Sequence, residues 1–80
     1  MNRTKAKYCV GQMIHHKLFD YYGLILSVDQ EFCLSEEWYQ TMARSGPPKN
    51  KPWYHVQVHG GGGLRYVSES NLETDLSVLN

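Results

Sequence analysis

The stretch Ile14–Asp29, IHHKLFDYYGLILSVD, decides the fold of this chain. It predicts a strand, a tight connection at Asp20–Gly23 and a second strand, because period-two alternation bounded by Asp and Gly is typical of half-buried strands joined by a turn. The alternation places Leu24, Leu26 and Val28 on one face of the second strand and Ile25, Ser27 and Asp29 on the other. A lone hairpin is marginally stable in water, so further strands are expected to cover its apolar face.

The segments on either side of the hairpin supply these strands. Upstream, the apolar pattern predicts that the first strand runs from Val10 to His16. The elements expected downstream are a strand at Trp53–Val58, a glycine turn at His59–Gly63, a returning strand at Leu64–Ser68 and a helical turn at Ser68–Leu72. Leu76, Val78 and Leu79 either add a last edge strand or fray.

One short helix is predicted between the hairpin and the later strands. Ser35 is a favourable N-cap, and two glutamates follow it in the first turn, where the helix dipole favours negative charge. Trp38 and Met42 lie four residues apart and share a face that is expected to seat on the sheet. The Gly-Pro-Pro run from Gly46 ends the helix.

These elements predict one domain over residues 1–80. Several short strands with one helical insertion favour a mainly β fold, a small SH3-like β-barrel with one short helix inserted between strands. A chain of 80 residues has room for one compact core. Residues 1–7 are expected to form a flexible basic arm and residues 74–80 a tail.

The charge balance limits the function. The chain has 8 Lys and Arg against 8 Asp and Glu, a formal net charge of zero. Domains that mainly neutralise phosphates are usually basic, so nucleic-acid binding requires basic side chains gathered on one face.

Cys9 and Cys33 lack CxxC spacing and are interpreted as reduced thiols. No apolar run approaches membrane-spanning length, so no membrane partner is expected and the default location is the cytoplasm.

Neither metal nor catalytic chemistry is indicated. His15 and His16 are adjacent and point to opposite faces of a strand, and no cysteine or carboxylate has zinc-ligand spacing to His55 or His59. Gly60–Gly63 lacks the Lys-Ser/Thr ending of a phosphate loop. We therefore expect a non-enzymatic protein with no metal, no cofactor and no catalytic residues.

Two sets of side chains are candidates for binding. Aromatic residues flank the proline loop, and such residues can form surfaces for peptides or unstacked bases. Trp38 and Tyr54 are assigned to the core, which leaves Tyr39, Trp53 and His55 as candidate partner-binding residues. The candidate DNA-binding residues are the basic side chains that either share one rim or form a merely solvated face: Lys17, Arg44, Lys49, Lys51 and Arg65.

Five fragments, in order, resemble the HspQ, or YccV-like, family. They are HKLFDYYGLI at 16–25, Asp29, EWY at 37–39, PWYHV at 52–56 and YVSESNL at 66–72. The residues that carry the resemblance are His16, Phe19, Gly23, Asp29, Trp38, Pro52, Tyr54, Tyr66, Glu69 and Asn71. The similarity covers Tyr8 to about Glu73. The sequence departs from the family pattern at Gly60–Gly63, where relatives usually have a longer acidic loop, and in its short tail.

The resemblance implies a small SH3-like barrel that binds hemimethylated DNA and belongs to the heat-shock proteins. It also implies an alternative, because relatives act in regulated proteolysis: bacterial members modulate the Lon protease, and similar domains occur in an F-box protein and a plastid Clp adaptor. The alternative function is therefore an adaptor or modulator of ATP-dependent proteolysis that acts through protein–protein contacts. Bacterial members form trimers, which implies a homotrimer, and a structural oligomer without a dedicated ligand is a third hypothesis.

Substitutions separate these hypotheses. Charge reversal at Lys49 and Lys51 is expected to weaken DNA binding and to leave a protease partnership intact. Trp53→Ala is expected to do the reverse, unless Trp53 lies in the core, in which case the variant is simply less stable.

Overall fold

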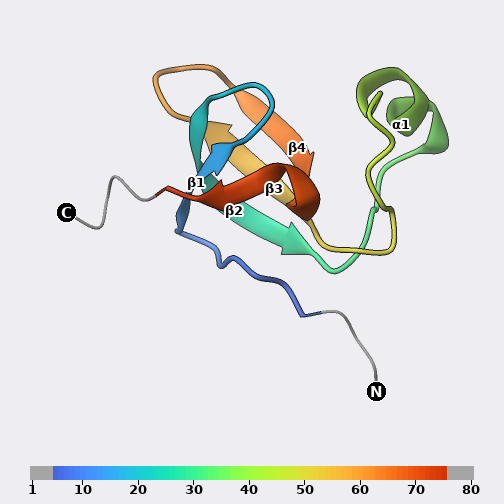
Figure 1. The fold of residues 1–80 in the computed structure, drawn as a ribbon, viewed down its shortest axis with the longest axis horizontal. Helices are drawn as coiled ribbons and strands as arrows, with labels where there is room; N and C mark the ends of the chain where they lie inside the picture. Colours follow the sequence, from blue (N-terminus) through green and yellow to red (C-terminus); the bar gives the residue numbers. More distant parts are fainter. Residues whose placement is uncertain (1–4, 76–80) are drawn as a thin grey trace.

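The computed structural model describes residues 5–75, which form five strands and two helical segments. In chain order these are β1 (Met13–His16), β2 (Tyr22–Asp29), α1 (Glu36–Met42), β3 (Trp53–Val58), β4 (Leu64–Ser68), the 3₁₀ helix η1 (Glu69–Asn71) and β5 (Leu72–Thr74) (Figure 1). The predicted mainly β fold with one short helix between strands is confirmed. The edge strand considered at 76–79 lies outside the described residues.

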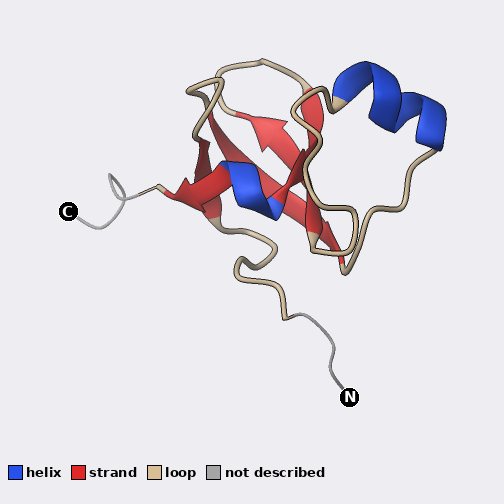
Figure 2. Cartoon of the chain, turned by 45° about the vertical axis from the view of Figure 1, so that its right-hand side comes forward, coloured by secondary structure: helices blue, strands red, loops and turns tan. Residues whose placement is uncertain are grey.

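All five strands belong to one antiparallel sheet with the order β4-β3-β2-β1-β5. In the predicted hairpin, Met13 lies opposite Leu24 and His15 lies opposite Tyr22. Only the three residues of η1 connect β4 to β5, the two edge strands of the sheet (Figure 2). So short a connection keeps the two edge strands near each other, as the predicted SH3-like barrel requires.

A β-bulge in β2 changes which of its residues face the core. The pairing with β3 shifts between Ile25 and Ser27. Ile25 is fully buried and Val28 packs against the same core, whereas Leu26 is 42% exposed. The prediction that Leu24, Leu26 and Val28 share one apolar face is therefore wrong, because the extra residue at a bulge inverts the alternation on one side of it.

Every strand contributes to one hydrophobic core. Its buried members are Ile14, Ile25, Tyr54, Val56, Val67 and Leu72. Tyr54 belongs to it, as the sequence predicts, and its hydroxyl donates to Glu69 Oε2 at 2.6 Å. Burial, followed by this bond to a carboxylate, raises the pKa of Tyr54, so the phenol stays protonated and acts as a donor.

Both ends of the described chain are held more firmly than the sequence predicts. Ala6 packs against the core, and the backbone N–H of Lys7 donates to Glu69 Oε2 at 2.9 Å. At the other end, Thr74 pairs with Ile14 in the β-ladder, and the next residue, Asp75, is buried. Residues 6, 7, 74 and 75 therefore belong to the folded domain and not to the predicted arm and tail. The sequence does not reveal this at the C-terminal end, because a strand as short as β5 has no recognisable alternation.

The helix α1 lies beside the sheet, and none of its residues is buried (Figures 1 and 2). Ser35 is its N-cap, as predicted, and the Ser35 hydroxyl accepts the backbone N–H of Trp38 at 3.0 Å. The predicted seating of the helix on the sheet is correct only for Trp38, which is half-buried, since Met42 is 62% exposed. The helix therefore presents Met42 on an open surface.

The close approach of β2 to β3 at Gly23 leads to a first prediction. A Cβ atom at this position would lie 2.4 Å from Val56 Cγ1 and 2.9 Å from the Gln57 carbonyl oxygen. Gly23→Ala is therefore expected to lower the free energy of unfolding by about 1–3 kcal/mol, as overpacking does, measured by urea denaturation. Ser27→Ala, an exposed change in the same strand, is the control. An unchanged unfolding midpoint for Gly23→Ala would contradict this packing.

Candidate functional site

The face of the sheet opposite the core carries a cluster of aromatic rings. Trp53 is only 1% exposed, because Phe32, Trp38 and Tyr66 pack on its ring with centroid distances of 4.9, 6.1 and 5.2 Å. Its Nε1–H donates to the Pro48 carbonyl oxygen at 3.0 Å. The prediction of Trp53 as a surface residue and Trp38 as a core residue is wrong. The chain after β2 folds back over β3, so Trp53 is covered and Trp38 belongs to the half-buried cover.

The other two partner-binding candidates are half-buried. The Tyr39 hydroxyl donates to a backbone carbonyl at 2.6 Å, and the Lys49 ammonium lies 4.3 Å from the centre of the Tyr39 ring. His55 Nε2 lies 3.3 Å from Asp29 Oδ2, and the ring packs against Tyr66 with centroids 4.6 Å apart. Both side chains thus have structural partners within the molecule.

Asp29 at the end of β2 connects three segments beneath these rings. Tyr66 donates its hydroxyl to Asp29 Oδ2 at 2.7 Å and accepts the backbone N–H of Cys33 at 3.0 Å. Burial, followed by the bond to Asp29, raises the pKa of Tyr66 and keeps it a donor. Desolvation and nearby carboxylates also raise the pKa of the Cys33 thiol, which disfavours the reactive thiolate. These hydrogen bonds connect β2, β4 and the backbone at Cys33, so their role is structural.

The connection between β1 and β2 is built on the side chain of His16. This residue is 3% exposed, and its Nδ1 accepts the backbone N–H groups of Leu18 at 3.2 Å and Phe19 at 3.0 Å. The imidazole also stacks on the Phe19 ring, with centroids 4.8 Å apart and 20° between the planes. Asp20, at φ 57°, closes the turn. These contacts fix Lys17, Leu18 and Phe19, which we call the loop tip, in one conformation outside the sheet.

Two adjacent histidines hold this loop, and their pKa values are shifted in opposite directions. Burial lowers the pKa of His16, so the ring stays neutral and Nδ1 stays an acceptor. His15, on the other face of β1, donates from Nε2 to Asp20 Oδ1 and from Nδ1 to Glu73 Oε2, both at 2.6 Å. These hydrogen bonds raise the pKa of His15. In its charged form His15 ties the turn to β5.

The raised pKa of His15 predicts a pH-dependent contribution to stability. A His whose pKa is higher in the folded state contributes stability that is fully present below the unfolded value of about 6.5 and is lost as the pH rises through the folded value. His15→Gln is therefore expected to be more destabilising at pH about 5.5 than at pH about 8.5. Urea denaturation at both pH values measures the difference. His59→Gln, an exposed change elsewhere, is the control; an equal effect of His15→Gln at both pH values would contradict the charged clamp.

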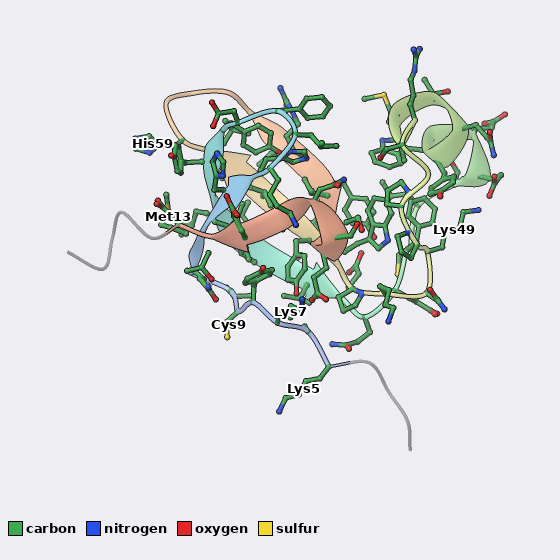
Figure 3. The ribbon with its side chains drawn as sticks, viewed as in Figure 1. Lys5, Lys7, Cys9, Met13, Lys49 and His59 are labelled. Atoms are coloured by element: carbon green, nitrogen blue, oxygen red, sulfur yellow. The ribbon has the colours of Figure 1, made fainter. Side chains whose placement is uncertain are left out.

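The five predicted DNA-binding cations are divided between two regions. Arg44 and Arg65 line one groove on the surface, and Lys17 is at the loop tip beside this groove. Lys49 lies beside α1, where it pairs with the first glutamate of the helix and covers the Tyr39 ring (Figure 3). Lys51 is exposed in the chain just before β3 and does not line the groove.

This groove, of about 1210 Å³, opens between the loop tip, β4 and α1, and we call it the apolar groove. Its large exposed hydrophobic side chains are Leu18, Phe19, Leu26, Leu34, Met42 and Leu64. Sequence reasoning missed it, because these residues come from five separate segments and the bulge at Leu26 conceals which way that side chain faces. The exposed apolar residues themselves are the only sequence signal, and they resemble core residues until the fold is known.

Residues 5–75 contain no group of three or more His, Cys, Asp and Glu side chains arranged to hold a metal ion. In the same range, no helix combines the length and the apolar character needed to cross a bilayer. Cys9 and Cys33 are both free and exposed.

A family model described as "Hemimethylated DNA-binding protein YccV like" matches residues 6–79, nearly the whole chain. The chain belongs to the YccV-like family. The resemblance drawn from the five sequence fragments is thereby confirmed. The family description is one of DNA binding, which supports the broader prediction of a DNA-binding protein.

The residues that carry the YccV-like resemblance fall into two groups in the structure. Nine of the ten are buried or half-buried, whereas Phe19 is 75% exposed. Several of the nine have structural contacts: Glu69, for instance, accepts bonds from the Tyr54 hydroxyl and from the Lys7 backbone, and the backbone carbonyl of Asn71 accepts the N–H of Lys17. Phe19 is therefore the YccV-like motif residue most accessible to a ligand.

Proposed function

We propose that this protein binds duplex DNA and prefers a hemimethylated site, using the loop tip and the cations beside it. The match of the YccV-like family model to residues 6–79 carries the proposal. The 75% exposure of Phe19, in a motif whose other members are buried or half-buried, supports the loop tip as the contact surface.

The chemistry of the loop tip suits a methyl group in the major groove of DNA. Leu18 and Phe19 are 59% and 75% exposed, and apolar side chains of this kind contact base methyl groups. Because His16 already fixes the loop, little conformational entropy is lost on binding. Burial of one methyl group contributes about 0.8 kcal/mol, or roughly a fourfold change in affinity. A single loop tip contacts one strand, so a methyl group on one strand is sufficient for this contact.

Electrostatic attraction to the phosphates supplies a modest part of the binding energy. The formal net charge is zero, so the contribution must come from individual cations near the contact surface. Lys17 belongs to the loop tip, and Arg65 lines the same groove as Leu18 and Phe19. In residues 5–75 neither cation pairs with a carboxylate. Two phosphate contacts predict a slope of about −2 for log affinity against log salt.

Charge reversal tests this surface. Lys17→Glu and Arg65→Glu are each expected to weaken DNA binding about tenfold, the effect of losing one charge-assisted contact. Fluorescence anisotropy with a labelled duplex measures the change. Lys49→Glu, which the sequence alone predicts to weaken DNA binding, is instead the matched control, because a glutamate of α1 already pairs with Lys49. If Lys49→Glu weakened binding as much as the other two, the loop tip would not be the DNA contact.

A further inference from the structure

Exposed hydrophobic side chains are concentrated in the apolar groove. The part of the chain described by the structure has eight large hydrophobic side chains that are exposed, and six of them line this groove. Away from the loop tip, the most exposed of these side chains are Met42 in α1 and Leu64 in β4, which are 62% and 65% exposed. Such contiguous patches mark interaction sites in soluble proteins, whereas single exposed residues do not.

The charged side chains of the groove have one sign. Arg44 and Arg65 line it, and its described lining includes no Asp or Glu. Their hydrogen bonds are to backbone carbonyls: Arg44 Nε to Thr41 at 3.4 Å and an Arg65 terminal nitrogen to Leu64 at 2.9 Å. Neither guanidinium forms an ion pair within residues 5–75. A ligand with carboxylates therefore meets two uncompensated cations.

We propose that the apolar groove binds a short segment of a partner protein that combines neighbouring large apolar side chains with at least one carboxylate. Apolar side chains would cover Leu26, Leu34, Met42 and Leu64, and the carboxylate would pair with Arg44 or Arg65. The phosphates of DNA would satisfy only the two arginines, because a DNA backbone has no apolar groups that reach across so wide a hydrophobic surface. Met42, being unbranched and flexible, adapts to different apolar partners. The proposal does not depend on DNA binding at the loop tip.

Selection from a library of random short peptides displayed on phage tests the chemistry of the partner directly. The full-length protein is immobilised, and enriched sequences are expected to combine Leu, Ile, Phe or Trp with Asp or Glu. Synthetic fluorescein-labelled copies of the strongest binder are then titrated with the protein. Enrichment of basic peptides, or of none above the bare support, would overturn the proposal.

Matched variants locate the binding site of the selected peptide. Leu64→Ser and Met42→Ser are each expected to weaken peptide binding about tenfold, as the loss of one buried apolar side chain does. Val10→Ser removes an apolar residue that is 63% exposed but lies outside the groove, and is expected to leave the affinity unchanged. Arg44→Glu is expected to shift preference towards a copy of the peptide with Lys in place of its acidic residues. Thermal melts establish that each variant is folded.

DNA anisotropy on the same variants distinguishes the two proposals. Leu64→Ser and Met42→Ser are expected to bind the duplex as the wild type does while losing the peptide. If these variants lost DNA binding and kept peptide binding, the groove would belong to the DNA surface and the protein-partner proposal would be wrong. Equal peptide affinity for Leu64→Ser and Val10→Ser would also overturn it.

Discussion

Trp53→Ala is expected to destabilise the fold by about 3–5 kcal/mol, the usual effect of removing a buried tryptophan. Trp53 is 1% exposed, four aromatic rings pack on it, and its indole N–H has a backbone acceptor. Domains of this kind have total stabilities of about 5–15 kcal/mol, so the loss would remove much of the folded population. Urea denaturation followed by tyrosine fluorescence and circular dichroism measures the change.

Two further variants show whether the effect comes from burial. Trp53→Phe keeps an aromatic ring in the cluster and is expected to destabilise less. Trp38→Ala removes a half-buried ring of the same cluster, so its effect is also expected to be smaller. Should Trp53→Ala leave the unfolding midpoint unchanged, the aromatic cluster over β3 would not exist in solution.

His16→Ala is expected both to lower stability and to weaken DNA binding. Its Nδ1 is the acceptor for the Leu18 and Phe19 N–H groups, and loss of such an acceptor costs about 1–3 kcal/mol. Without the acceptor and the stacked ring, the loop tip no longer has one conformation, and ordering it on binding then lowers the affinity. Denaturation and DNA anisotropy are measured on the same preparation.

His16→Asn is the control that keeps an acceptor near the position of Nδ1, and it is expected to recover part of both losses. The stability of the wild type and that of His16→Asn should also depend differently on pH. The pKa of His16 is lowered in the folded state, so its contribution is present above about 6.5 and is lost as the pH falls through the folded value. The wild type is thus expected to lose stability on acidification relative to His16→Asn. A parallel pH dependence of the two would contradict a neutral, hydrogen-bonded His16.

The fold was predictable where local signals agree with one another. The hairpin, the N-cap at Ser35 and the alternation of β3 follow from turn residues, capping chemistry and period two. The errors lie where tertiary structure overrides a local pattern. The bulge after Ile25 is invisible in a sequence of alternating apolar residues, and β5 exists only because β1 offers a partner. The exchanged roles of Trp38 and Trp53 depend on how the chain after β2 folds back.

The candidate site was predictable only in part. Arg44 and Arg65 do lie on one groove, as the hypothesis of a shared basic rim requires, but Lys49 is engaged with α1. Sequence reasoning included Phe19 only as a residue of the family resemblance. Its exposure depends on the buried His16 beneath it, and burial of a histidine is not readable from the sequence.

The loop tip is proposed to recognise a single methyl group on duplex DNA. The most direct test is fluorescence anisotropy with one duplex in unmethylated, hemimethylated and fully methylated forms over a series of salt concentrations. The account predicts that the hemimethylated form binds about fourfold more tightly than the unmethylated one, that the preference disappears in Phe19→Ser, and that affinity falls with a salt slope of about −2. Equal affinities for the three forms, with or without Phe19, would contradict it.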